Sequence, residues 1–345
     1  MKKFKKILTF TIVLIVITSI LTCCRMESIS TIANITTIRP VKVGVLMYSD
    51  NVFSVVIANS LKDIQKEKGN EAEITVFDSK ANSAMEGEIL NSMLDDNYDL
   101  LLVNIEGKTV PELIEDSVKK AEQKNISLIF FNVNPEKLDV IRSYSKSLII
   151  NNDSKEAGIL QGKMIVDAWN TNKNTMDKNG DKIMQYIMIE GAVKNFAAED
   201  RTKYSISTIN DAGIKTQELA SVPANWDQEL AKSAIESLFL RYSGNIEVII
   251  SNNDVMAIGA VQGLQKYGYN MGDKTKTIPI FAINRRPETE DLIKKGFIAG
   301  SVPRNSRAFA DALYTVGMNL VSGKNPLEGT NYKFDESGVI ITIQF

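Results

Sequence analysis

The sequence contains no histidine, and its only cysteines are the adjacent pair Cys23 and Cys24. Histidine is the commonest general base and the commonest metal ligand, so its absence argues against Ser-His and Cys-His nucleophilic sites. Two neighbouring cysteines close to the N-terminus cannot supply a disulfide or a Cys-rich zinc site for the rest of the chain. A phosphate-binding loop of the GxxxxGK type is also missing from the sequence. Together these absences predict that the protein is not an enzyme.

Charge of one sign is not in excess either. The 40 basic and 42 acidic side chains are interspersed and leave a net charge of -2, so no basic patch predicts binding to nucleic acid. Apolar residues make up 44% of the 345 residues, which is ample material for two hydrophobic cores. The length and composition therefore favour a protein of two ordinary-sized lobes.

The N-terminal segment has the pattern of an export signal. A basic stretch at 1–6 precedes an uninterrupted apolar run at 7–22. The following ILTCC (20–24) resembles the bacterial lipobox, which implies that Cys24, or alternatively Cys23, carries a lipid. An uncleaved anchor is the other interpretation, because the apolar run is only slightly shorter than a bilayer span. With 1–24 as signal and the polar stretch 25–40 as tether, we expect an exported protein anchored to the outer face of the cytoplasmic membrane.

From Val41 onward, short apolar runs alternate with helical patterns. The runs are VKVGVLM (41–47), EITVF (73–77), DLLLV (99–103), SLIFF (127–131) and SLII (147–150), then YIMIE (186–190), IKTQELA (214–220), EVIIS (247–251), IPIFAI (278–283) and IAGSV (298–302). Such alternation predicts two similar α/β lobes, each with a parallel sheet covered by helices on both faces. Ligands of these sheets bind beyond the carboxyl ends of the strands. Functional residues are therefore expected at 48–53, 132, 191–201, 252–254 and 284.

Motifs near these strand ends resemble the bacterial galactose/glucose-binding proteins of sugar ABC transporters. The matching segments are FFNVNPE (130–136), DSKEAGILQG (153–162), DKNGDKIMQY (177–186), NIEVIISNNDVMAIGA (245–260) and GTNYKFD (329–335). The resemblance implies two Rossmann-like lobes joined by a three-strand hinge, with a sugar bound between them. It also implies hinge crossings near 150–152, 302–305 and 340–342. The N-terminal lobe would then comprise 41–150 plus 305–340, and the C-terminal lobe 151–304 plus 341–345.

The same resemblance implies a set of sugar-binding residues. A sugar site needs planar Asp, Asn and Arg groups for the hydroxyls and an aromatic face for the ring. Trp226 would stack on the sugar, Arg201 would donate to it, and Asp50 would accept from a hydroxyl. Each residue also has a simpler interpretation. Trp226 could cover a hydrophobic core, Asp50 could cap a helix N-terminus, and Arg201 could be a solvated surface charge. The implied sugar contacts are Asp50, Asn132, Asn195, Arg201, Trp226, Asn253, Asn284 and Arg304.

Several of these positions depart from the family pattern. Asn195 stands where the family has His, Asn284 and Ala197 where it has Asp, and Arg304 where it has Asn. The stacking Phe aligns with Val52, next to Phe53. Each lost charge-assisted hydrogen bond is worth about 1.5–3 kcal/mol. The departures predict a ligand other than glucose or galactose, with a pentose such as xylose the first candidate; a modified sugar or an acidic sugar attracted to Arg304 also remains open.

A second motif, DKNGDKIMQ (177–185), has the alternating oxygen ligands of a calcium loop. Asp177, Asn179 and Asp181 would bind through side-chain oxygens, Ile183 through its carbonyl and Gln185 through its amide oxygen. The resemblance adds Glu247 as a distant carboxylate and so predicts Ca²⁺ as a cofactor. Lys182 stands where such loops have Gly with positive φ, at a cost of about 1 kcal/mol. Without Glu247 the motif could be only a turn.

The predicted function is that of an extracytoplasmic monosaccharide-binding protein whose partner is the membrane permease of a sugar ABC transporter. The altered pocket and the membrane tether leave a second interpretation open. In it the sugar-loaded protein acts as a sensing partner of a membrane histidine kinase in two-component signalling.

Overall fold

The computed structural model describes residues 39–48, 52–105, 110–133 and 138–345. The predicted export signal, most of the tether, the lipidation site Cys24 and the sugar contact Asp50 lie outside these residues. Among the helices that the structure does describe, none is both long enough and apolar enough to cross a membrane.

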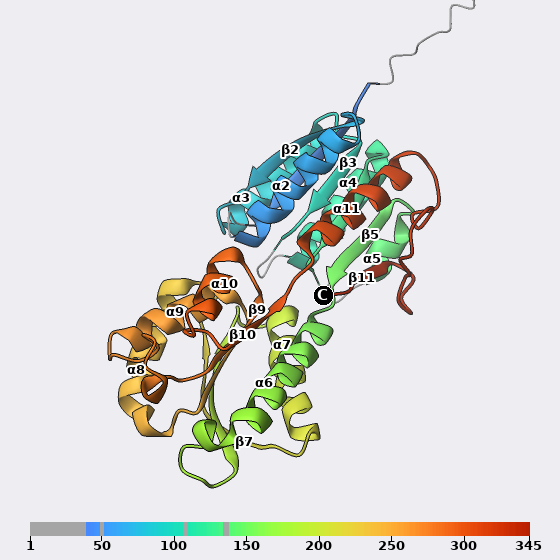
Figure 1. Ribbon diagram of the computed structural model, residues 1–345. Helices are drawn as coiled ribbons and strands as arrows, with labels where there is room; N and C mark the ends of the chain where they lie inside the picture. The colour runs from blue at the N-terminus through green and yellow to red at the C-terminus, as the bar shows by residue number, and fades with distance from the viewer. Residues whose placement is uncertain (1–38, 49–51, 106–109, 134–137) are drawn as a thin grey trace, which may run out of the picture. The chain divides into compact units, whose positions relative to one another are not determined.

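The first lobe is built on a six-stranded parallel sheet (Figure 1). Apolar side chains of α2 and α11 cover one face of this sheet, and those of α3, α4 and α5 cover the other. The strands stand in the order β11-β5-β4-β3-β1-β2. The elements are β1 (Val41–Met47), α2 (Val52–Glu67), β2 (Ala72–Asp78), α3 (Ser83–Asp95), β3 (Leu100–Val103), α4 (Val110–Lys124), β4 (Ser127–Phe131), α5 (Leu138–Ser143), β5 (Ser147–Asn152), α11 (Ser306–Val321) and β11 (Ile340–Ile343).

The second lobe has a five-stranded parallel sheet in the order β10-β9-β8-β6-β7. Helices α6 and α7 pack on one face, and α8, α9 and α10 on the other. The elements are α6 (Ser154–Met176), β6 (Ile183–Glu190), α7 (Phe196–Asp211), β7 (Lys215–Pro223), α8 (Gln228–Tyr242), the 3-10 turn η1 (Ser243–Asn245), β8 (Val248–Ser251), α9 (Asp254–Gln265), the 3-10 turn η2 (Lys274–Lys276), β9 (Ile280–Asn284), α10 (Pro287–Lys294) and β10 (Gly300–Pro303).

The predicted α/β fold with two parallel-sheet lobes is confirmed. Each of the ten apolar runs identified in the sequence forms a strand. Within each lobe the first five strands follow the same order, in which the second strand lies outside the first. The chain therefore changes direction across the sheet between β1 and β3, and again between β6 and β8. Open sheets of this kind bind ligands at that switch point, beyond the strand ends.

The last strand corrects one predicted boundary. We expected 341–345 in the C-terminal lobe, but β11 pairs in parallel with β5 and completes the first sheet. Ile341 and Ile343 are buried in the core of the first lobe, which fixes the strand there. The end of the chain also contacts the second lobe: the Phe345 N–H donates to Glu156 Oε2 at 2.8 Å, and the Phe345 ring packs against the cluster of Ala157, Ile283 and Val302.

Asparagine and aspartate side chains start most of the long helices. Each accepts hydrogen bonds from backbone N–H groups of the first helical turn, which would otherwise lack a partner. In both lobes these residues follow strands, so the polar side chains that cap helices gather at the same edge of each sheet. The capping residues are Asn82, Asp153, Asn195, Asp227, Asn253 and Asn305.

Two glycines let α6 approach α7 closely. A Cβ atom at Gly162 would lie 2.7 Å from the Ser205 carbonyl oxygen and 2.6 Å from Thr208 Cβ. A Cβ atom at Gly158 would lie 2.8 Å from the carbonyl oxygen of Arg201. The position of α7, and with it that of Arg201, therefore depends on glycine at both sites.

Replacement of Gly162 by alanine should destabilise the protein, because the added methyl group meets the α7 backbone. We expect a cost of about 1–3 kcal/mol, typical of overpacking. Gly87→Ala is the matched control: it lies within α3 and its Cβ would meet only Leu113 Cδ1, at 3.9 Å. That change should stabilise α3 by about 0.5–1 kcal/mol. Urea unfolding followed by circular dichroism would contradict this packing if both variants moved the midpoint in the same direction.

Candidate functional site

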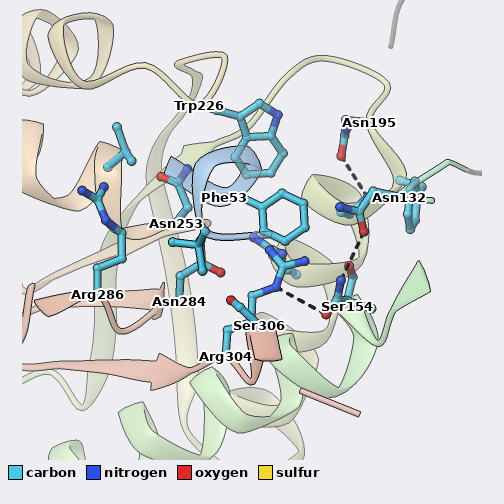
Figure 2. Close-up of a pocket in the computed structure, with 16 residues that line it drawn as sticks. Phe53, Asn132, Ser154, Asn195, Trp226, Asn253, Asn284, Arg286, Arg304 and Ser306 are labelled. Atoms are coloured by element: carbon cyan, nitrogen blue, oxygen red, sulfur yellow. Dashed lines mark hydrogen bonds between the residues drawn. The ribbon is translucent and has the colours of Figure 1, made fainter. Parts of the chain in front are cut away.

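One pocket collects residues from the strand ends of both lobes. It encloses about 130 Å³ and is lined by Phe53 and Asn132 of the first lobe and by residues of the second (Figure 2). Asp50 lies outside the described residues. The other predicted sugar contacts all line this pocket: Asn132, Asn195, Arg201, Trp226, Asn253, Asn284 and Arg304.

Trp226 presents its ring to the pocket from the turn before α8. Its φ of 62° is a left-handed conformation that bulky residues rarely adopt, so the turn holds it under strain. The indole lies directly against the end of β6, since a Cβ atom at Gly191 would come within 2.1 Å of indole Cζ2. The ring also packs partly against the hydrophobic core of α8 and α9. Trp226 therefore caps a core, as the simpler interpretation expected, and forms an aromatic wall of the pocket as well.

Two asparagines at strand ends also have positive φ, a conformation that asparagine tolerates better than most residues. Asn132, after β4, has φ 52° and its Oδ1 accepts from Asn152 Nδ2 at 3.2 Å. Asn284, at the end of β9, has φ 110°. Its Oδ1 is buried without a partner. A buried acceptor of this kind is normally paired in a complete structure, so Asn284 can accept from a ligand hydroxyl.

The side chains of Asn195 and Asn253 cap the N-termini of helices. Asn195 Oδ1 accepts from the N–H groups of Ala197 and Ala198 at 3.0 and 3.2 Å. Asn253 Oδ1 accepts from the Met256 N–H at 2.9 Å. Their side-chain oxygens therefore hold helices α7 and α9, and their Nδ2 groups can donate to a ligand.

Arg201 is a buried cation. Only 5% of the residue is exposed, so the interpretation as a solvated surface charge is wrong. Its Nη1 donates to the Asn252 carbonyl at 2.8 Å, whereas its Nε has no partner. The guanidinium lies 5.6 Å from the ring of Trp226 and 5.5 Å from that of Phe345. Burial lowers the pKa of Arg201 to about 10, which leaves it charged at neutral pH.

Arg304 enters the pocket from the segment between β10 and α11. Its guanidinium lies over the Phe53 ring, 3.7 Å from the ring centre (Figure 2). Its Nε donates to Asn152 Oδ1 at 3.3 Å. Burial holds the pKa of Arg304 well below its usual value, and the charge of Arg201 lowers it further. Phe53 is thus the aromatic residue that the α2 end presents to the pocket, next to the aligned Val52.

The sequence analysis did not identify every residue of the pocket. Asn152 links Asn132 to Arg304 by hydrogen bonds from the end of β5. Arg286 follows β9, and its N–H donates to Asp254 Oδ2 at 2.7 Å. Both follow strands, so the rule used for the other positions applies to them too. Phe196 falls within the predicted range 191–201, whereas Ser306 begins a helix and carries no comparable signal.

The predicted calcium loop is closed by hydrogen bonds to carboxylates. Glu247 accepts from the N–H groups of Lys178 and Gln185 at 2.6 and 3.1 Å, which ties the loop to the start of β8. Asp181 accepts from the Ile183 N–H at 2.7 Å and from Gln185 Nε2 at 2.8 Å. Burial raises the pKa of Glu247, and the negative charges of Asp177 and Asp181 raise it as well.

Some features of this loop suit a cation with oxygen ligands. Asp177 Oδ1 is buried without a partner. Asn179 and Gln185 donate to Asp181 through Nδ2 and Nε2, so their oxygens would have to turn toward a bound ion. Lys182 has φ 65°, the conformation for which such loops use glycine. In the described part of the chain, however, no three carboxylates lie close enough to hold a metal by themselves. A bound ion would therefore depend on amide and carbonyl oxygens, which Ca²⁺ accepts.

The chain is similar to known binding proteins along most of its length. A family model described as a periplasmic binding protein domain matches residues 43–325. The D-galactose/methyl-galactoside binding periplasmic protein of Haemophilus influenzae is 32% identical over 302 residues, or 87% of this chain and 86% of that protein. The ribose import binding protein of Escherichia coli is 22% identical over 245 residues, or 70% of this chain and 73% of that protein.

Solved structures agree on the fold. A periplasmic solute binding protein from Actinobacillus succinogenes with bound D-allose superposes with a TM-score of 0.71, at 17% identity over 88% of this chain and 96% of that one. The Caulobacter myo-inositol binding protein gives a TM-score of 0.68, at 17% identity over 88% of this chain and 91% of that one.

Proposed function

This chain belongs to the periplasmic binding protein family, and we propose that it is the sugar-binding component of an ABC transporter that holds one monosaccharide in the pocket lined by both lobes. The family makes it an exported protein. The observation that carries the proposal is the pocket itself, which combines the aromatic faces of Phe53 and Trp226 with amide and guanidinium groups. That combination matches a sugar ring with hydroxyls around an apolar face.

The described residues divide the recognition of a sugar among them. Trp226 offers the stacking surface, and the unpartnered Arg201 Nε offers a donor. Asn284 Oδ1 offers an acceptor, and the Nδ2 groups of Asn195 and Asn253 add donors. Closure of both lobes over the sugar would pair these groups while excluding water, since unpaired buried polar groups are costly.

The N-terminal segment supports a second candidate function. A lipid on Cys24 and a short tether would hold the pocket close to the membrane surface. A membrane histidine kinase could then recognise the sugar-loaded form instead of a permease. The two functions share the same pocket and ligand, so they differ only in the partner.

The acceptors of the pocket favour a ligand with few hydroxyls. Ala197 offers no side-chain acceptor, and Asn195 and Asn253 use theirs as caps. A sugar hydroxyl that found no acceptor on closure would cost about 1–3 kcal/mol. Among neutral sugars, a pentose such as xylose is accordingly the first candidate.

We also propose that the loop Asp177–Gln185, with Glu247, binds Ca²⁺. Such an ion would bind the side chains of Asp177, Asn179, Asp181 and Gln185 and the carbonyl of Ile183, and would offset the repulsion among the carboxylates. Its role would be structural, because the loop joins α6 to β6 away from the residues of the pocket.

Trp226→Ala tests the sugar-binding proposal directly. Removal of the stacking face should weaken the best monosaccharide at least about tenfold, or about 1.4 kcal/mol. Trp169→Phe is the control, because Trp169 is buried in the core of the second lobe and does not line the pocket. Unchanged affinity of the Trp226 variant in calorimetry, or no binding of any monosaccharide by the unmodified protein, would contradict the proposal.

A second test concerns the size of the neutral ligand. The unmodified protein should bind xylose more tightly than glucose, and Ala197→Asp combined with Asn284→Asp should shift the preference toward hexoses by restoring two acceptors. Calorimetry with both sugars measures the ratio. The prediction is wrong if glucose binds with submicromolar affinity and xylose binds about a hundredfold, or about 2.8 kcal/mol, more weakly. The pocket would then accept a hexose despite the changes at Ala197 and Asn284.

The calcium proposal predicts a metal-dependent stability. In metal-stripped buffer, added calcium should raise the thermal unfolding midpoint, because a ligand of the folded state stabilises it. Asp177→Asn should abolish this response by removing the unpartnered carboxylate oxygen. Asp273→Asn, at the cap of η2 in the same lobe, should retain it. A midpoint that calcium does not change would mean that the loop is held by its hydrogen bonds alone.

A further inference from the structure

Two guanidinium groups share the pocket without a carboxylate partner among the described residues. Neither Arg201 nor Arg304 forms an ion pair there, and each contacts an aromatic face instead. Their guanidinium groups both lie 5.5 Å from the ring centre of Phe345, so both contact this one ring. A third cation, Arg286, lines the same pocket (Figure 2).

Asp254 and Glu156 form hydrogen bonds with other groups, although the negative charge of Asp254 also opposes the lowering of the Arg201 pKa by burial. Asp254 accepts from the Ser301 hydroxyl at 2.6 Å and from the Arg286 N–H at 2.7 Å. Glu156 accepts from the Phe345 N–H at 2.8 Å. Among the described residues that line the pocket, none is acidic. The site therefore offers a surplus of positive charge to whatever occupies it.

Burial makes this arrangement unfavourable in the empty pocket. Charges removed from water are stable only when they are paired and hydrogen-bonded. Burial and the repulsion from Arg201 both disfavour the positive charge of Arg304 and lower its pKa. The Nε of Arg201 is also buried without an acceptor. One negatively charged group that reached both guanidiniums would supply acceptors to both and would offset part of the positive charge.

We propose that the sugar bound here carries a carboxylate, as in a uronate, and that Arg201 and Arg304 bind that group. The inference rests on the proposed function and specifies the chemical class of its ligand. A planar carboxylate matches the fork of N–H donors on a guanidinium and can accept from both residues at once. Trp226 can then contact the sugar ring, while Phe53 supports Arg304.

Three sugars test the charge at constant ring geometry. Xylose, glucose and glucuronate share one pyranose ring and carry hydrogen, hydroxymethyl and carboxylate at the same carbon. We expect calorimetry to give glucuronate an affinity at least about tenfold above that of glucose, since charged hydrogen bonds are about twice as strong as neutral ones. Galacturonate should exceed galactose in the same way. The pairs differ in charge and little else, so the ratio isolates the carboxylate.

Arg304→Met tests the residue. The variant keeps an unbranched side chain over Phe53 but should lower the affinity for glucuronate at least about tenfold while lowering that for glucose much less. Arg307→Met is the matched control, because it removes the same charge three residues away from an exposed pair with Glu67. Near-ultraviolet circular dichroism confirms that the variants are folded, and the comparison of sugars on the unmodified protein does not depend on them.

The outcomes separate the two proposals. If glucose or xylose binds as tightly as glucuronate, or if Arg304→Met lowers both equally, the ligand is neutral: this inference fails and the sugar-binding function stands. If no sugar binds, charged or neutral, the proposed function fails and this inference fails with it. A glucuronate preference that Arg304→Met removes and Arg307→Met retains supports both.

Discussion

Parallel pairing is the constraint on which the rest of this structure depends. It brings the carboxyl ends of all strands in a sheet to one edge, and each strand there must lead into a helix whose first N–H groups need acceptors. The chain meets that need with asparagine and aspartate at the strand-to-helix joints of both lobes. Polar side chains therefore gather at the sheet edges for a reason of backbone chemistry, before any ligand is considered.

That origin gives the pocket an uneven chemistry. The side-chain oxygens of Asn195 and Asn253 accept from helix N-termini, so these residues meet a ligand chiefly as donors. Arg201 and Arg304 also only donate. Asn284 is different, since its Oδ1 is buried without a partner. A pocket rich in donors and poor in acceptors selects for a ligand that brings its own acceptors.

The apolar runs predicted the strands, and the strand-end rule identified five of the predicted sugar contacts in the pocket: Asn132, Asn195, Arg201, Asn253 and Asn284. Trp226 and Arg304 were identified by the resemblance alone. The roles of all seven toward a sugar rest on the resemblance. The sequence could not show that β11 completes the first sheet, because its partner β5 is almost two hundred residues away. Nor could it show that Phe345 contacts both guanidiniums, or that Gly191 makes room for an indole. Those features depend on contacts between distant segments, which leave no local pattern.

The late position of α11 and β11 has a consequence for the order in which the chain folds. Phe309 and Leu313 of α11 fill the core of the first lobe, yet they follow the entire second lobe in the chain. The second lobe is made of one continuous stretch and can close its core by itself. The first lobe must keep an apolar face of its sheet open until the last helix arrives, after a long loop has been closed. A nascent or newly exported chain is therefore most exposed to aggregation at α2 and the neighbouring strands, and a chaperone that binds there would protect it.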